Sequence, residues 1–325
     1  MQALDAIGSL PSIFLSSVAP PLSIAFVGYL LGRVREVDTD GLSAAAIYVL
    51  LPALVFETLV TLTADLGTVT AAVAAMVVFT FAMGALALGM GRLRGQDGPV
   101  AFGAAMAAAV PNAGNFGIPV TSFAFGAIGR STAVLFVLVQ NVLLHTLGIY
   151  LLSTGGDEEA YVDGLRRVLR QPVVWALVAA GLVTGLGVVP PEDGTAMETL
   201  RLLGNASIPV FLLILGLQVE SMDLSATVRE TLPTVGLKLF VAPVVALAVA
   251  LLVNVGDPTV TAAFVVLAAG PAAVTPLVLS LEFADDAGAP VSTADYVGTV
   301  VFLTILGCLP IVTGLILLAE LGVLG

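Results

Sequence analysis

The stretch Val110-Pro111-Asn112-Ala113-Gly114-Asn115-Phe116-Gly117-Ile118-Pro119 interrupts a segment, Gly98 to Gly129, that contains no Lys, Arg, Asp or Glu. A membrane-spanning helix needs about 20 apolar residues, so this segment is too long for one plain helix. Prolines remove backbone donors and glycines loosen the chain, so we expect a helix that breaks near Pro111 and then restarts. In hydrocarbon, broken backbone is tolerated only where protein or a water-filled cavity satisfies its polar groups. The break therefore predicts the floor of a transport site, to which Asn112 and Asn115 offer side-chain amides.

The composition is that of an integral membrane protein. Hydrophobic residues make up 58% of the chain, charged residues 10%, and the mean hydropathy is +1.09, whereas soluble domains carry about 25% charged residues. The net charge of −12 and the absence of basic clusters disfavour nucleic-acid binding. An acid-rich, Lys-poor surface suits solvation at high salt, so we expect a halophilic prokaryote. The single cysteine, Cys308, excludes a disulfide framework and a Cys-based metal site. We expect no cofactor and no metal.

Charged residues divide the chain into ten apolar runs, each long enough for one helix across a hydrocarbon core of about 30 Å. The sequence therefore predicts an all-α membrane protein with ten transmembrane helices. The runs are 6–32, 41–56 (extending to residue 62), 66–91, 98–129, 131–156, 171–191, 202–219, 231–256, 258–281 and 296–319.

Basic residues are distributed unequally between alternate loops. Most of them fall on one side of the predicted membrane: Arg33, Arg35, Arg92, Arg94, Arg166, Arg167, Arg170 and Arg229. The other side holds Arg130 and Arg201. Because cytoplasmic loops carry the excess of Lys and Arg, we predict a multi-pass plasma-membrane protein with both termini outside and a cytoplasmic central loop.

The two halves of the chain resemble each other. Pro52 in the second run and Pro209 in the seventh are separated by nearly half the chain length, and Pro111 and Pro271 are separated by nearly the same interval. Five helices per repeat is an odd number, so the second copy must enter the membrane from the opposite side. An inverted repeat with two Pro/Gly-broken helices at matching positions is typical of a secondary transporter. The predicted parts are a first repeat, a cytoplasmic linker and a second repeat: 1–153, 154–171 and 172–325.

Two helices that break at the membrane middle, the fourth and the ninth, can cross there. The second half-helices, beginning near Phe116 and Val274, then point their partial positive ends toward the crossing, which suits a carboxylate without any buried Lys or Arg. The alternative is that each Pro/Gly cluster is only a packing kink. The predicted substrate-binding residues are Pro111, Asn112, Gly114, Asn115, Pro271, Val274 and Thr275.

The run from Pro111 to Pro119 resembles the fourth-helix motif of the auxin efflux carrier family, which includes plant PIN proteins and prokaryotic permeases linked to malate and malonate. The tail from Glu282 through Asp295 to Pro310 is similar but less specific. The resemblance covers essentially the whole chain and implies the fold of the bile acid/anion/auxin transporter superfamily. It also implies a scaffold of helices 1, 2, 6 and 7, often dimeric, a moving transport domain of helices 3–5 and 8–10, and a substrate at the crossing, where Pro111 and Asn112 match the family's crossover and Pro271 its partner.

Two departures from the family pattern matter. The central loop is short, unlike the long regulated loop of many plant members, which argues against an auxin-regulated plant protein. Around Pro271, Ala272 and Ala273 offer no side-chain polarity, so that half of the site depends on backbone groups and Thr275.

Three further polar residues lie within apolar runs and allow two interpretations each. His145, with Asn141 one turn away and Gln140 beside it, is a proton carrier or substrate contact, or makes a helix–helix hydrogen bond. Glu57 binds a coupling cation, or faces the outer vestibule or a dimer seam. Lys238 extends its ammonium to the cytoplasmic interface, or attracts anions into the inner cavity.

The predicted function is secondary transport of a small organic anion, a carboxylate, by elevator-type alternating access in a homodimer within the lipid bilayer. A sodium-coupled symporter of the bile-acid type and an anion channel are the alternatives, and the coupling ion, H⁺ or Na⁺, stays open. A channel is expected to show charge rings or a carbonyl filter. An enzyme is not expected, because no G-x-S-G arrangement partners His145 and no apolar run has a central Asp.

Overall fold

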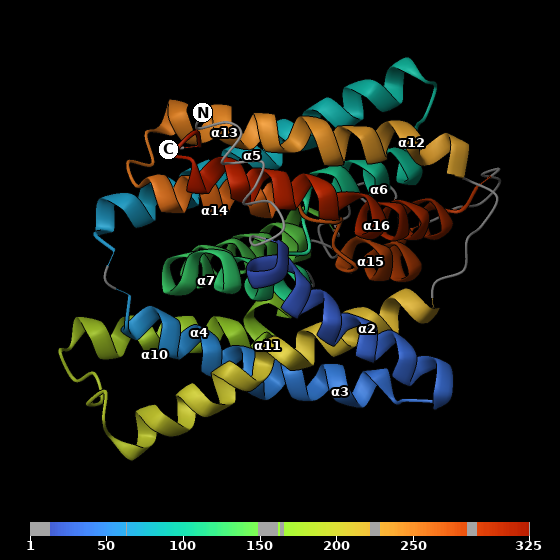
Figure 1. Ribbon diagram of the computed structural model, residues 1–325. Helices are drawn as coiled ribbons and strands as arrows, with labels where there is room; N and C mark the ends of the chain where they lie inside the picture. Colours follow the sequence, from blue (N-terminus) through green and yellow to red (C-terminus); the bar gives the residue numbers. More distant parts are fainter. Residues whose placement is uncertain are drawn as a thin grey trace.

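The computed structural model describes residues 14–62, 64–148, 162, 166–221, 228–284 and 291–324, and every regular element in these ranges is a helix (Figure 1). Elements labelled η are single π-helical turns, which occur mostly within or at the ends of longer helices. The elements before the central linker are η1 (Phe14–Val18), α2 (Ala19–Val34), α3 (Thr39–Ala45), η2 (Ala46–Leu50), α4 (Leu51–Val60), α5 (Leu66–Leu93), α6 (Gly98–Ala109), η3 (Ala113–Gly117), α7 (Ile118–Leu143) and η4 (Leu144–Gly148). Those after it are α10 (Pro172–Gly185), α11 (Thr195–Ser221), α12 (Val228–Gly236), η5 (Leu237–Val241), α13 (Ala242–Val253), α14 (Pro258–Ala269), α15 (Thr275–Phe283) and α16 (Thr293–Glu320).

The predicted all-α fold is confirmed for the described residues, where each of the ten apolar runs contains helix. Six helices within the described part of the chain are long and apolar enough to cross a membrane: Thr39–Val60, Leu66–Leu93, Ala113–Gly148, Thr195–Glu220, Val228–Val253 and Thr293–Glu320. The shorter apolar helices are Ala19–Val34, Gly98–Ala109, Pro172–Gly185 and Pro258–Ala269. The chain is therefore a multi-pass membrane protein, while the ten-span inverted repeat stays a prediction. Most of the predicted linker, 154–171, lies outside the described residues.

The helices form two groups, one above the other in Figure 1. In the lower group, α11 packs against α2 and α4, and α10 packs against α4. In the upper group, α5 packs against α6 and α13, while α16 packs against α6, α12, α14 and α15. The helix α7 lies between the groups and contacts α5 and α14 on one side and α4 and α11 on the other. The boundary between the groups therefore runs along α7.

One glycine divides α7 into two helices. Gly126 has φ +60° and ψ −137°, a conformation that side chains rarely permit, so the chain turns there. The hydroxyl of Thr121 joins the two sides of the turn by bonding to the carbonyls of Gly117 at 2.8 Å and Gly129 at 3.0 Å. The helix of the fourth apolar run thus ends at Gly126, four residues before Arg130, where the charge pattern placed its boundary.

The crossing of α2 and α11 depends on two other glycines. A Cβ atom at Gly216 would overlap the carbonyl oxygen of Ala25, and one at Gly28 would overlap the carbonyl oxygen of Leu213. Small residues at a membrane helix interface let backbones approach closely, and the resulting van der Waals contact stabilises the pair. The lower group is therefore held together by backbone contact at this crossing.

We predict that Gly216→Ala destabilises the protein, because the overlap forces α2 and α11 apart and overpacking typically costs about 1–3 kcal/mol. The matched control is Gly181→Ala in α10, where a Cβ meets no atom within 4 Å. Thermal unfolding in detergent should show a lowered midpoint for Gly216→Ala and no decrease for Gly181→Ala. Equal midpoints for the two variants would contradict the assigned contact.

Candidate functional site at the helix crossing

The first interruption has the cause predicted from the sequence. The helix α6 ends at Ala109, and Val110 is extended at φ −111° and ψ 100°, as expected for a residue that precedes a proline. Helical structure resumes at Ala113, where the side-chain oxygen of Asn112 accepts a hydrogen bond from the backbone N–H of Asn115 at 3.1 Å. The break near Pro111 is confirmed, and Asn112 caps the second half-helix.

The second interruption lies between α14 and α15 and meets the first. Pro111 and Ala272 form an isolated antiparallel bridge. The N–H of Asn112 donates to the carbonyl of Pro271 at 2.8 Å, and the N–H of Ala273 donates to the carbonyl of Val110 at 2.9 Å. Each break therefore satisfies backbone groups that the other one frees, as hydrocarbon surroundings demand. The predicted meeting of the two broken segments is confirmed.

A side chain from α16 completes the crossing. The N–H of Ala272 donates to the hydroxyl oxygen of Thr304 at 3.0 Å, and this hydroxyl bonds in turn to the carbonyl of Val300 at 2.7 Å. Both Ala272 and Thr304 are fully buried. Thr304 thus supplies the acceptor that Ala272 lacks where the helix is broken.

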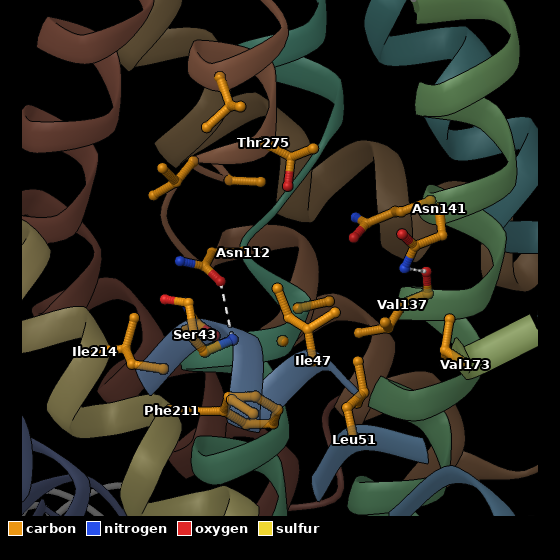
Figure 2. Close-up of a pocket in the computed structure, with 18 of the residues that line it drawn as sticks. Ser43, Ile47, Leu51, Asn112, Val137, Asn141, Val173, Phe211, Ile214 and Thr275 are labelled. Atoms are coloured by element: carbon orange, nitrogen blue, oxygen red, sulfur yellow. Dashed lines mark hydrogen bonds between the residues drawn. The ribbon is translucent and has the colours of Figure 1, made fainter. Parts of the chain in front are cut away.

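A cavity of about 520 Å³ opens beside the crossing (Figure 2), within the range of about 300–1,000 Å³ typical of small-molecule sites. Figure 2 shows Asn112 and Thr275 on one wall and Asn141, Val137 and Val173 on the other. Most of the predicted site residues line it: Pro111, Asn112, Gly114, Asn115, Asn141, His145, Val274 and Thr275. Pro271 does not line the cavity and instead supplies the carbonyl that holds Asn112.

Two amide donors beside the cavity are buried and have no hydrogen-bond partner among the described residues: Nδ2 of Asn112 and Nε2 of Gln140. The orientation of Asn112 is fixed, because its oxygen caps the half-helix and its nitrogen must therefore face elsewhere. A buried donor without a partner costs about 1–3 kcal/mol. Both amides are thus suited to a ligand that accepts hydrogen bonds.

Two other polar side chains of the cavity, those of Asn141 and His145, are bonded to carbonyls of their own helix. Nδ2 of Asn141 donates to the carbonyl of Val137 at 3.0 Å, and Nδ1 of His145 lies 3.0 Å from the carbonyl of Asn141. Asp40 is the one acidic residue among the lining residues, and no Lys or Arg is among them. Any attraction for an anion must therefore come from amides, backbone groups and charges outside the lining.

Glu57 lies outside the cavity lining, in a cluster that we call the Glu57 cluster and define as Glu57, Arg130, Arg201 and Asn205. The carboxylate is 4% exposed. It lies 3.0 Å from Nη2 of Arg130 and 3.6 Å from Nε of Arg201, and Nη1 of Arg130 donates to the side-chain oxygen of Asn205 at 3.0 Å. Two guanidinium groups thus already neutralise the Glu57 carboxylate, which the sequence analysis considered as a ligand for a coupling cation.

The expected extension of Lys238 to the interface is wrong. Lys238 is fully buried on η5, and its Nζ donates to the carbonyl of Ala268 at 2.7 Å. It does not line the cavity either. Its position ten residues inside the helix that begins at Val228 corresponds to about 15 Å of helix, which the side chain does not span.

The sequence did not indicate two parts of the site. One is the unpaired amide of Gln140, whose only signal is its place beside Asn141 on a polar turn of α7. The other is the apolar wall that faces the crossing, formed by Ile47, Leu51, Phe211 and Ile214 (Figure 2). These four residues are ordinary members of apolar helices, so their place in the wall depends on the packing of α4, α7 and α11.

Comparison with known proteins gives the family. A family model described as "Membrane transport protein" matches residues 13–316. The chain belongs to this family. The match confirms the resemblance to the auxin efflux carriers. The transporter is also 29% identical to a protein of Methanothermobacter thermautotrophicus (strain Delta H) named "Uncharacterized transporter", over 243 residues that cover 72% of this chain and 78% of that protein.

We predict that Thr304→Val destabilises the transporter, because it leaves the buried N–H of Ala272 without an acceptor at a cost of about 1–3 kcal/mol. The matched control is Thr313→Val on the same helix, since the hydroxyl of Thr313 bonds only to the carbonyl of Leu309. Thermal unfolding should show a lower midpoint for Thr304→Val than for Thr313→Val. Identical midpoints would show that Thr304 does not support the crossing.

Proposed function

We propose that this transporter is a secondary carrier for a small organic anion that bears a carboxylate. The observation that carries the proposal is the crossing itself, where the half-helices that begin at Ala113 and Thr275 both start beside the cavity. Helix N-termini favour negative charge. The unpaired donors of Asn112 and Gln140 fit a carboxylate, which accepts hydrogen bonds and donates none.

We predict that Asn112→Asp weakens carboxylate binding at least tenfold and leaves the fold intact. Aspartate caps a helix as well as asparagine does, so the bond to Asn115 is kept, whereas the donor is replaced by a negatively charged acceptor. The measurement is thermal stabilisation of the purified wild type and variant by acetate, pyruvate, succinate and benzoate. We expect an increase of at least tenfold in the Kd of the best carboxylate, with an unfolding midpoint near that of the wild type in the absence of ligand. Unchanged affinity would refute the assigned site.

Alternating access is supported by the position of the Glu57 cluster relative to the cavity. The same three helical segments flank both, and along each of them the cavity residues come from one end and the cluster residues from the other. On α3–η2–α4 the cavity residues lie between 39 and 51, and Glu57 follows them. On α7–η4 the cavity residues lie between 137 and 145, and Arg130 precedes them. On α11 the cavity residues lie between 211 and 218, and Arg201 and Asn205 precede them. We call the boundary that these segments form along α7 the seam. We propose that the cluster closes the end of the seam that lies opposite the cavity.

We propose that the cavity opens at the end that lies toward the basic loops. Its lining includes Thr39 and Gln171, which neighbour Arg35 and Arg170 in the chain. By the positive-inside rule this end is cytoplasmic. We therefore propose an inward-facing state of a plasma-membrane carrier with both termini outside.

The two groups of helices suggest which parts move. We propose that the lower group, which contains α2, α4, α10 and α11, is the scaffold, and that the upper group with α7 is the transport domain of an elevator mechanism. In this proposal the chain divides into repeats 1–153 and 172–325, and a second copy docks on the scaffold. An anion channel is the alternative of another class, and currents far above carrier turnover would favour it.

We predict that Glu57→Gln lowers the accessibility of the cavity from its open end, because loss of the ion pairs destabilises the state in which the far end is closed. The reporter is Ser43→Cys in a Cys308→Ser background, since Ser43 lines the cavity and Cys308 is the single native cysteine (Figure 2). We expect the rate of maleimide labelling in nanodiscs to fall at least twofold.

The matched control for this experiment is Arg33→Gln, which removes an exposed guanidinium that bonds to Tyr29 and takes no part in the Glu57 cluster, and it should leave the labelling rate unchanged. An equal rate for Glu57→Gln and the reporter protein alone would show that the cluster is only a structural contact. Both variants carry the same reporter cysteine, and labelling is measured without substrate, so the comparison does not require the substrate to be known.

A further inference from the structure

Lys238 is the only lysine in the chain, and the structure places it in the interior of a membrane protein. The closest approaches between charged groups in the described residues join Glu57 to Arg130 and Arg201, and Glu282 to Arg167. No carboxylate of the described residues lies within 4 Å of the Lys238 ammonium. A buried charge in a membrane protein is costly and marks a functional site more often than a structural one. Its role is therefore to be sought in what it contacts.

The contact of Lys238 is a carbonyl that the broken helix leaves free. In an unbroken helix the N–H of Ala272 would bond to the carbonyl of Ala268. At the crossing this N–H donates to Thr304 instead, and the N–H of Gly270 bonds to the carbonyls of Val266 and Leu267. The carbonyl of Ala268 is left over, and Nζ of Lys238 donates to it at 2.7 Å.

The geometry of this contact is that of a cation at the C-terminal end of a half-helix. Such ends carry a partial negative charge of about half an elementary charge. In carriers with broken helices, the unwound carbonyls and C-terminal half-helix ends coordinate the coupling Na⁺ or H⁺. Lys238 brings a covalently attached cation to the end of α14, so that this carbonyl needs no cation from solution.

The helix ends at the crossing and the Lys238 ammonium together determine the sign of the net charge there. Two half-helices begin there, at Ala113 and Thr275, and two end there, at Ala109 and Ala269. The partial charges of these four ends, each of about half an elementary charge, nearly cancel. A protonated Lys238 then makes the crossing positive overall, although no Lys or Arg lines the cavity.

We infer that Lys238, bonded to the free carbonyl of Ala268, determines the charge selectivity of the crossing and takes the place of a metal cation from solution. The inference rests on the proposed function, because it concerns the anion that the cavity would bind. Lys238 does not touch this anion. It is a positioning residue that acts through the end of α14 and through its charge.

The test compares carboxylate binding by the wild type, Lys238→Met and Thr234→Val, each purified in detergent and titrated calorimetrically with acetate, pyruvate, succinate and benzoate. Methionine keeps the length and the apolar stem of the side chain but removes the charge. Thr234→Val is the matched control, because Thr234 is also buried on the same helix and its hydroxyl bonds to Tyr296 without a charge. Each titration is run in sodium chloride and in choline chloride at equal ionic strength.

The expected result has two parts. The wild type binds its best carboxylate with the same Kd, within twofold, in both salts, and Lys238→Met raises that Kd at least tenfold while Thr234→Val changes it less than twofold. A structural role alone predicts a lower unfolding midpoint for Lys238→Met without a loss of affinity in the folded fraction.

Two results would overturn the inference and leave the proposed function standing: binding by the wild type only in sodium, or binding by folded Lys238→Met with wild-type affinity. If Lys238→Met does not fold, the comparison of sodium and choline in the wild type decides alone. If none of the four carboxylates binds to the wild type, the proposed function fails and the inference fails with it.

Discussion

The structure depends on the requirement that backbone polar groups in a membrane interior find partners within the protein. Pro111 and Pro271 each end a helix in the interior and free backbone groups there. The two breaks are placed so that Asn112 bonds to Pro271 and Ala273 bonds to Val110. Neither break is stable by itself, because each uses the other as its hydrogen-bond partner. The crossing is therefore a single cooperative unit, although its halves lie far apart in the sequence.

The same requirement produces the chemistry of the site. A continuous helix presents only side chains to a cavity, whereas a broken helix also presents unpaired N–H and C=O groups and the partial charges at its ends. At the crossing the free acceptors find partners within the protein: Val110 bonds to Ala273, Pro271 bonds to Asn112, and Ala268 bonds to Lys238. The donors of Asn112 and Gln140 do not. These two unpaired donors support the proposal of an anion rather than a cation in the cavity.

The positions of the breaks and the pairing of the two interrupted segments could be predicted from the sequence, because proline and glycine act locally and the repeat relates one break to the other. The roles of the isolated charges could not. Glu57, Arg130 and Arg201 lie on three different helices, and only the packing of those helices shows that one carboxylate serves both arginines. The length of the Lys238 side chain suggested that its ammonium reaches the membrane interface. The ammonium instead bonds to the free carbonyl of Ala268 in the protein interior. The only sequence signal of Gln140 was its place beside Asn141.

These contacts also differ in how they can respond to motion. The crossing joins α6, α14 and α16 through hydrogen bonds to backbone groups, and each bond would leave a buried group unpaired if broken, so its parts must move together. The seam along α7 is different, because it holds a cavity at one end and the Glu57 cluster at the other. Arginine and carboxylate side chains that separate at the end of a seam can be hydrated, whereas separated backbone groups in the interior cannot. In the proposed mechanism, exposing the cavity to the other side costs least when the crossing moves as a rigid body and the seam rearranges, and this cost supports the proposal of an elevator over unwinding at the prolines.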